Sequence, residues 1–238
     1  MKKLITLILG MVMVMSLVAC SNDTTHVDNL GDNGSNVGNE PPHSQEETKG
    51  NSSASIISVD TVMKAKESPE SDFFCVDIGN NEVAVLEYMG NDEIVVIPET
   101  WNGKKVVEIS HLTFANDSAK IRGIRLPDSL RLIDKGAFSH SSMLEVVVCG
   151  AGLVEIAEAA FHNCINLKEI ILNDGLVTMR EFSLSGSEKL TSVVIPASAT
   201  DINPNAFYWV VDGFEIIGEA GSAAETYAKS QGISFKAK

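Results

Sequence analysis

The amino-acid sequence predicts a mostly β repeat solenoid of the α/β type, with a parallel sheet, an N-terminal β cap and a C-terminal cap made of a helix and a strand. Three observations predict this fold. An apolar pattern recurs every 23 residues, a bulky residue follows each copy at a fixed distance, and the flanks of the repeats carry a different pattern. A fixed period of this size is typical of chains that coil into stacked turns.

The chain begins with a segment that is typical of an exported lipoprotein. Two lysines precede an apolar run over residues 4–18, which is shorter than the roughly 20 residues that a membrane-spanning helix needs. The run ends in the letters LVAC, which resemble the lipobox of bacterial lipoproteins. The resemblance implies that residues 1–20 contain a lipoprotein signal peptide and that Cys20 is acylated. The alternatives are an uncleaved apolar anchor and a plain secretory signal.

Residues 21–71 are predicted to be a disordered polar tether. Up to residue 55 the segment consists mainly of Asn, Asp, Gly, Ser, Thr and Glu, and its few apolar residues show no period. Such a composition cannot bury enough apolar surface to offset the loss of chain entropy. Near its end, Asp60 and Pro69 are typical of the start and the termination of a short helix, which we expect near residues 60–67.

Each repeat contains a first apolar phrase of the form L-x-x-L-x-L. Its copies start at residues 121, 144, 167 and 190, which are 23 apart each time. A second apolar pair follows in register, and five residues later comes a bulky column that reads Phe114, Phe138, Phe161, Leu184 and Phe207. Stacking of the copies places these side chains in interior rows and the strands about 4.8 Å apart. Because Phe182 lies two positions before Leu184, we expect a local distortion at residues 182–187.

The unit A-F-x-x-C/S-x-x-L-x-x-I-x-I-P-x-x-V-x-x-I resembles the BspA-like bacterial leucine-rich repeat, and residues 160–167 match it most closely. The flanks resemble the capping elements of that family. The resemblance implies a short right-handed leucine-rich repeat solenoid over residues 72–238, with an N-cap at 72–98, repeats at 99–213 and a C-cap at 214–238. It also implies a surface protein that acts in adhesion or protein–protein contact. Within the C-cap we expect a helix over residues 222–231, with Gly232 after its end.

The charge and the motif content exclude several classes of function. The chain has 32 acidic and 18 basic residues, for a net charge of −14, which disfavours nucleic acid and anionic lipid as partners. The sequence contains no nucleophile elbow, no zinc-protease motif, no phosphate-binding loop and no calcium-binding loop. We therefore expect no enzyme activity, no cofactor, no metal site and no nucleic-acid partner.

The cysteines and histidines of the repeats are interpreted as structural. Cys149 falls in an interior column and Cys164 in a turn column, and a disulfide between them is an alternative for an exported protein. His111, His140 and His162 fall near the phenylalanine coil, and His140 and His162 are expected to be neighbours on one edge of the solenoid. We interpret all three as solvated turn residues.

The fifth position of the first phrase predicts a binding face. In a strand, alternation turns the fourth and sixth positions inward, so that the fifth points outward. Across the copies, and 23 residues beyond the last, this position holds Arg125, Val148, Ile171, Val194 and Ile217. Four adjacent β-branched side chains form an apolar stripe about 15 Å long, at about 4.8 Å per strand. The same residues are also explained by β-propensity on a half-shielded sheet, and this alternative stays open.

Together these features predict a membrane-anchored, surface-exposed and non-catalytic protein-binding module. The lipid on Cys20 holds it to the extracytoplasmic face of the bacterial membrane, and the sheet face binds a host, matrix or bacterial surface protein. The main alternative is a structural or envelope-assembly lipoprotein that pairs with another bacterial surface protein. A hydrolase without a recognised motif is a remote alternative.

Overall fold

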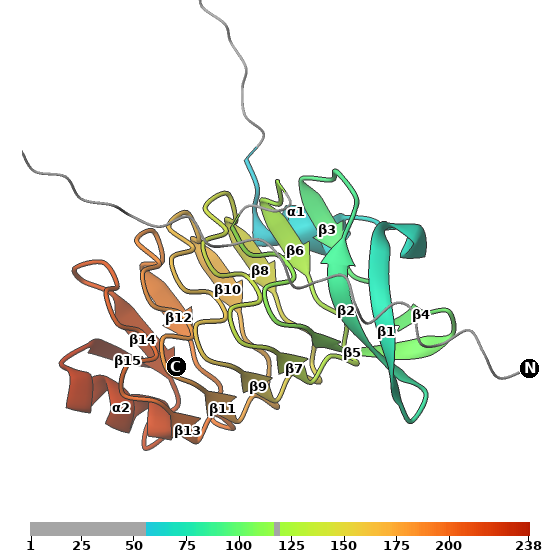
Figure 1. The fold of residues 1–238 in the computed structure, drawn as a ribbon. Helices are drawn as coiled ribbons and strands as arrows, with labels where there is room; N and C mark the ends of the chain where they lie inside the picture. Colours follow the sequence, from blue (N-terminus) through green and yellow to red (C-terminus); the bar gives the residue numbers. More distant parts are fainter. Residues whose placement is uncertain (1–55, 117–119) are drawn as a thin grey trace, which may run out of the picture. The chain divides into compact units, whose positions relative to one another are not determined.

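The computed structural model describes residues 56–116 and 120–238, which coil into the solenoid shown in Figure 1. The predicted signal peptide, Cys20 and the predicted tether up to residue 55 lie outside the described residues. In the part that is described, no helix has both the length and the apolar content that crossing a membrane requires.

The chain winds through two rows of short strands. In the described residues, the first row is an 8-stranded sheet with the order β1-β2-β5-β7-β9-β11-β13, in which β4 pairs with β5. From β2 to β13 the neighbours in this order run parallel. The bounds are β1 Phe73–Gly79, β2 Glu82–Tyr88, β4 Thr100–Trp101, β5 Lys104–Ile109, β7 Leu132–Ile133, β9 Glu155–Ile156, β11 Thr178–Met179 and β13 Asp201–Ile202.

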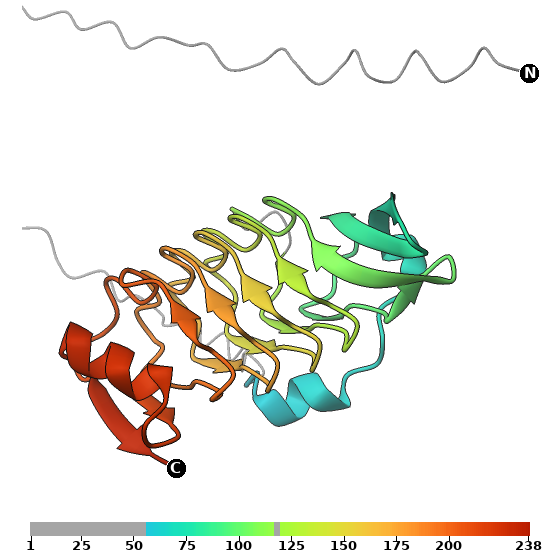
Figure 2. The same cartoon turned by 90° about the horizontal axis from the view of Figure 1, so that it is seen from below.

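The second row contains the strands that the first apolar phrase predicts (Figure 2). It comprises β3 Ile94–Val96, β6 Gly123–Arg125, β8 Val146–Val148 and β10 Glu169–Ile171 in one sheet, and β12 Ser192–Val194, β14 Glu215–Gly218 and β15 Ser234–Ala237 in another. Residues 23 apart lie directly opposite each other, as Ile124 does with Val147 and Val147 with Ile170. This register confirms the predicted solenoid, although its row of strands forms two sheets.

Stacked phenylalanine rings run through the core. The rings of Phe114, Phe138 and Phe161 lie nearly parallel, with 4.9 Å between the centroids of each neighbouring pair. The buried side chains of Leu184 and Phe207 continue the column. Because each buried ring contributes about 1.5–3 kcal/mol, the stack is a main source of stability in a chain with few aromatic residues.

The distortion expected at residues 182–187 is absent from the backbone. The main chain of this coil keeps its bonds to both neighbouring turns, since Leu184 N–H donates to the Ala206 carbonyl (2.9 Å) and Phe161 N–H to the Ser183 carbonyl (2.9 Å). Phe182 keeps the positive φ (55°) that Gly136 (64°) and Ala159 (55°) have at the same position of the two preceding turns, and its side chain is half-buried. The shift of the phenylalanine from position 184 to position 182 therefore changes where the ring lies, and the backbone of the coil is unaffected.

Both ends of the solenoid carry the predicted caps. At the N-terminal end, β1 and β2 form an antiparallel hairpin, and the ring of Tyr88 packs 6.1 Å from that of Phe114. At the C-terminal end, helix α2 covers the last turn with its buried face. It spans Ala223–Gln231, begins at the capping side chain of Ser222 and ends at Gly232, whose φ of 68° is the left-handed conformation that glycine adopts without strain.

The folded part begins earlier than the sequence predicts. Residues 56–71 are predicted to belong to the tether, with a short helix near residues 60–67. The helix is present as α1, Val59–Lys64, but it is packed on the domain, and Ile57 before it is already buried. The N-cap of α1 is Ser58, whose side chain accepts a hydrogen bond from the Thr61 N–H, and not Asp60. A 3-10 turn at Glu70–Asp72 then leads into β1. Packed structure therefore begins before the predicted boundary at residue 72.

Candidate binding surface

The outer face of the second row of strands, which the sequence predicts to bind a partner, is divided into two halves. Arg125, Val148 and Ile171 are cross-strand neighbours in one sheet, and Val194 and Ile217 are neighbours in the next. Ile171 is 37% and Val194 is 42% exposed, and Ile217 is half-buried, whereas Val148 is only 6% exposed. The prediction of one continuous exposed stripe is therefore wrong in its N-terminal half.

Helix α1 covers the N-terminal half of this face (Figure 2). Ile57 and Val62 form a buried cluster with Val146 and Val148 of β8. Burial of the two side chains from the α1 segment contributes about 1.5–3 kcal/mol each. Because a helix of six residues is unstable on its own in water, this packing holds α1 in place.

A glycine in β6 makes room for α1. Gly123 occupies the outward position that holds Val146 and Glu169 in the next two strands. A Cβ atom at Gly123 would lie 2.6 Å from Cγ2 of Val62 and 3.1 Å from Cγ2 of Ile57, which is closer than side chains pack. Helix α1 is therefore able to pack against β6 only because residue 123 has no side chain.

Arg125, which the sequence predicts to be part of the open face, binds α1 instead. Its Nη1 donates a hydrogen bond to the carbonyl of Met63 (3.0 Å), and its Nη2 donates one to the carbonyl of Ala65 (3.5 Å). Carbonyls at the end of a helix have no partner inside it, and a nearby cation satisfies them. Arg125 therefore fastens the end of α1.

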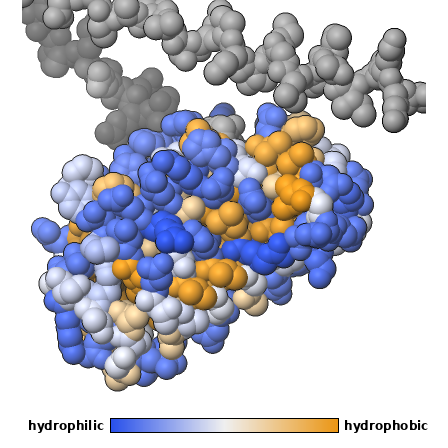
Figure 3. Space-filling view, turned by 60° about the horizontal axis from the view of Figure 1, so that its bottom comes forward, coloured by the Kyte–Doolittle hydropathy of each residue, from blue (hydrophilic) through white to orange (hydrophobic). Residues whose placement is uncertain are grey.

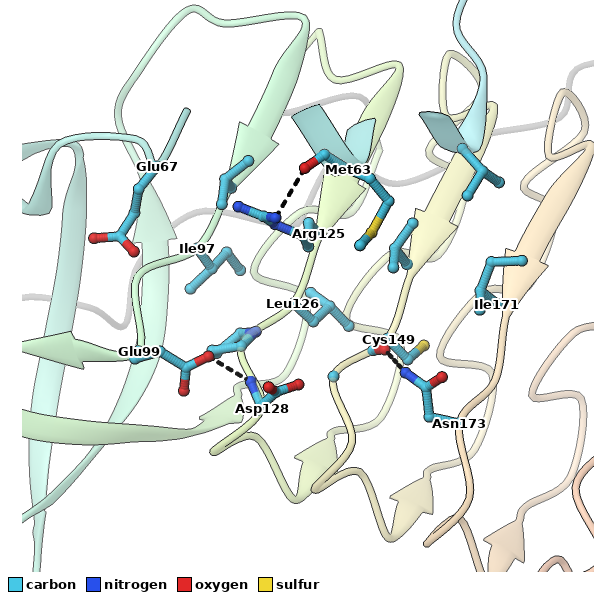
Figure 4. Close-up of a pocket in the computed structure, with 15 residues that line it drawn as sticks. Met63, Glu67, Ile97, Glu99, Arg125, Leu126, Asp128, Cys149, Ile171 and Asn173 are labelled. Atoms are coloured by element: carbon cyan, nitrogen blue, oxygen red, sulfur yellow. Dashed lines mark hydrogen bonds between the residues drawn. The ribbon is translucent and has the colours of Figure 1, made fainter. Parts of the chain in front are cut away.

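A groove of about 520 Å³ lies where the covered half of the face meets the open half (Figure 4). Val59 and Met63 of α1 line one side, and Val148 and Ile171 line it from the sheet. The loops that follow the strands contribute the remaining edge, which includes Pro127 and Gly150. The exposed side chain of Ile171 thus lies at the edge of an apolar groove.

Acidic groups border this groove. Glu67, Glu99 and Asp128 line it, and the Glu99 carboxylate accepts hydrogen bonds from the N–H groups of Asp128 (2.6 Å) and Ser129 (3.0 Å). These bonds fix one carboxylate at the rim. An apolar lining beside fixed negative charge suits an apolar side chain that is followed by lysine or arginine in a protein partner.

The N-terminal ends of the same strands carry a network of ion pairs. Arg122 Nη2 and Lys168 Nζ each lie 2.6 Å from a carboxylate oxygen of Glu145, and Arg122 also reaches Glu93 at 3.4 Å. The three central residues are 23 apart, so the repeat itself brings them together. Burial raises the pKa of Glu145, but hydrogen bonds from Lys168 and Arg122 outweigh this effect and hold the pKa below its usual value.

Acid is expected to weaken this network. Because the pKa of Glu145 is lower in the folded than in the unfolded chain, its stabilisation is full above the ordinary pKa of about 4.3 and is lost as the pH falls through the folded pKa. Glu145→Gln should lower the unfolding free energy at pH 7 by about 1–3 kcal/mol and flatten its decline towards pH 3. Urea unfolding at both pH values measures this, with exposed Glu169→Gln as the control. An unchanged pH profile in Glu145→Gln would contradict the assignment.

A second exposed apolar area lies on the N-terminal hairpin. Phe74, Val76 and Ile78 alternate along the outer side of β1 and are exposed, as is Leu86 of β2. Figure 3 shows apolar side chains gathered at this end of the domain. The alternating pattern of residues 74–78 is readable in the sequence, and the sequence-based prediction of the binding face does not include it.

The thiols of the described residues are unsuited to nucleophilic chemistry. Cys75, Cys149 and Cys164 are buried and form no disulfide, so the alternative of a Cys149–Cys164 disulfide is not realised. Cys164 Sγ instead donates a hydrogen bond to the carbonyl of Phe138 (3.1 Å). Burial raises the pKa of Cys149 to about 12, and burial together with Glu70 raises that of Cys75 to about 11. These two thiols are therefore protonated at neutral pH and behave as small apolar side chains.

His140 and His162 lie side by side on one edge of the solenoid, as predicted. The rings of His140 and His162 are 5.4 Å apart. Asn163 Nδ2 donates to Nε2 of His140 (3.1 Å), so the Nδ1 that faces Ser139 Oγ (2.8 Å) carries the proton and is unable to accept one from serine. Across the described ranges, no group of three or more His, Cys, Asp or Glu side chains is placed to hold a metal ion.

The repeats are similar to a known sequence family. Residues 97–211 match the sequence family described as the BspA type leucine-rich repeat region, in 6 copies. This part of the chain is similar to BspA-type repeat regions. The resemblance read from the sequence is thereby confirmed for the repeats, whose predicted limits were 99 and 213. No curated protein shows significant similarity to the chain.

Solved structures share the fold of the BspA-type repeat region. The leucine-rich repeat protein of T. pallidum is 28% identical over 64% of this chain and 71% of its own, with a TM-score of 0.59. A leucine-rich repeat protein from Bacteroides ovatus is 22% identical over 61% of this chain, with a TM-score of 0.52. The match spans 45% of the Bacteroides protein. Both comparisons support a parallel solenoid of mostly β structure.

Proposed function

We propose that the protein is an exported, lipid-anchored and non-catalytic binding module that docks a protein partner on the open half of the repeat sheet. The observation that carries the proposal is the exposure of Ile171 and Val194 on the neighbouring strands β10 and β12, next to the groove beside α1. An apolar centre with a charged border is typical of protein interfaces.

The BspA-type repeat region supports a role in binding. Each turn of a solenoid buries its core against its neighbours, so the outer faces remain available over the whole length of the array. The acidic border at Glu99 and Asp128 favours a partner segment that carries a basic residue beside an apolar one. We propose a host, matrix or bacterial surface protein as the source of that segment.

The double substitution Ile171→Glu and Val194→Glu is expected to weaken partner binding at least tenfold, because it places two charges at the centre of the apolar contact. Partners are first identified by cross-linking at the cell surface with the unmodified protein. Their affinities for the purified wild-type and variant proteins are then compared by biolayer interferometry, with circular dichroism as the test of folding.

The matched control is Val154→Glu with Val177→Glu. These residues are also 23 apart and similarly exposed, but they lie beside β9 and β11 in the other row of strands. This control should bind with unchanged affinity. Equal losses in both double variants, or no loss in the first, would move the binding site away from the open half of the sheet.

Substitution of Cys20 is expected to abolish the proposed anchor. The residue ends an apolar run in the pattern of a lipobox, and its thiol is the proposed site of acylation. Cys20→Ala should incorporate no labelled palmitate and should no longer partition with the membrane. Continued incorporation of the label by the variant would refute lipidation at this position.

A further inference from the structure

A strip of aromatic and imidazole rings follows one edge of the solenoid, outside the core. It consists of His140, His162, Phe182, Tyr208 and Trp209, each of which lies on a coil that follows a strand of the first row. The distances between successive ring centroids are 5.4, 6.2, 6.0 and 4.7 Å. The rings therefore form a continuous contact path over successive turns, separate from the sheet face proposed to bind protein.

The end of this strip is exposed to solvent. Trp209 is 68% exposed, which is the largest value among the aromatic residues described, and Tyr208 is also exposed. By contrast, the phenylalanine column inside the coils is buried. In a chain with only 2 tryptophans, one of them is thus placed where it contributes little to the core.

The backbone at Trp209 adds a second observation. The residue belongs to a turn column in which every member has a positive φ; the column reads Asn116, His140, Asn163, Gly186 and Trp209. Asparagine and glycine adopt this left-handed conformation readily, whereas a bulky side chain is strained in it. At Trp209, with φ 57°, the strain brings no compensating burial. A residue that adopts an unfavourable backbone conformation without burying its side chain is typical of a functional position.

Planar polar groups accompany the rings. Asn163 Nδ2 donates to Nε2 of His140, and Asn205 Nδ2 donates to Glu181 Oε1 (3.0 Å). The Nδ1 of His162 is buried and has no hydrogen-bond partner in the described part of the chain, so the exposed imidazole of the strip is that of His140. Amide, imidazole and carboxylate groups beside an aromatic ring match the needs of a sugar. The carbon–hydrogen face of a sugar stacks on the ring while its hydroxyl groups bond to the polar groups at the side.

We propose that this strip binds a neutral polysaccharide, with successive sugar units stacked along the rings. A linear row of rings suits a chain ligand, and the net charge of −14 disfavours an acidic glycan. A strip one ring wide is too narrow for the roughly 800 Å² per partner that a stable protein interface buries. The proposal concerns a different surface from the proposed function, and each can fail without the other.

A single-tryptophan protein tests the proposal directly. Trp101→Phe leaves Trp209 as the sole indole reporter. The probes are neutral cello-, malto-, manno- and chito-oligosaccharides of about six units. At least one series is expected to shift the emission of Trp209 and to protect it from acrylamide quenching. If all four series leave both the emission and the quenching unchanged, the proposal is overturned.

Two substitutions separate binding from folding. Trp209→Asn should reduce affinity for the active oligosaccharide at least tenfold by calorimetry, while raising the midpoint of thermal unfolding because asparagine relieves the strained turn. Phe74→Ala, at an aromatic residue that is 52% exposed on the N-terminal hairpin, should leave the affinity unchanged. A lowered midpoint in Trp209→Asn would show a structural role for Trp209, and equal losses of affinity in both variants would show nonspecific stacking. Either result overturns the proposal.

Discussion

Replacement of Phe138 by alanine is expected to lower the unfolding free energy by about 3–5 kcal/mol. The ring is 1% exposed and lies between two parallel rings, each with its centroid 4.9 Å away. Its removal leaves a cavity that the neighbouring turns are unable to fill, because their own backbones are held in register by the strand ladders. Urea unfolding of the folded domain measures the loss.

Phe74→Ala provides the matched control for this experiment. The same chemical change is made at a ring that is half exposed on β1, where little packing is lost. We expect the control to lose less than about 1 kcal/mol. Similar losses at the two positions would show that the stacked rings of the core are not the feature that stabilises the solenoid.

Gly123→Val is expected to displace α1 from the sheet. Even the first carbon of the new side chain would lie 2.6 Å from the Val62 methyl group, and the remaining atoms need the space that Ile57 occupies. The packing of the α1 segment is then lost, with a cost of about 3–6 kcal/mol if both apolar side chains return to water. In hydrogen exchange, the Val62 amide, which bonds to the Ser58 carbonyl, should lose its protection.

Ser192→Val is the control for the glycine substitution. Ser192 stands at the equivalent position of β12, on the open half of the face, and is exposed. Valine favours strands, so this variant should be as stable as the wild type or slightly more stable. Retained protection of the Val62 amide in Gly123→Val would show that α1 does not depend on the space above the glycine.

Much of the fold is predictable from the sequence because the same apolar positions recur in each copy of the repeat, and each recurrence independently indicates the same packing. Ile124, Val147 and Ile170 are found opposite one another because a coil of fixed length returns each to the same place. The caps are predictable for a related reason, since an end of the solenoid exposes an apolar cross-section that the flanking chain must cover.

The packing of α1 over the predicted binding face was not predicted, because α1 does not belong to the repeat. Its buried apolar contacts, Ile57 and Val62, lie in a short segment that precedes the first copy of the repeat and therefore shares none of its period. The usable signal was Gly123, a glycine in an outward strand position where no turn requires it. Such a glycine indicates that another part of the chain approaches closely.

The position of α1 explains which of the five predicted face residues are exposed and which are buried or bound. Ile171 and Val194 lie beyond the reach of α1 and remain exposed, whereas Val148 is buried beneath it and Arg125 is bound to its end. Alternation within a strand predicts which side of the sheet a residue faces. It does not predict what lies on that side, which depends on chain far away in the sequence.

The division of the sheet face into a covered half and an open half is tested most directly by nuclear Overhauser contacts between methyl groups. We expect cross-peaks that join the methyl groups of Ile57 and Val62 to those of Val146 and Val148, and none that join α1 to Val194. Absence of the first set, in a protein whose core methyl contacts are intact, would contradict this account.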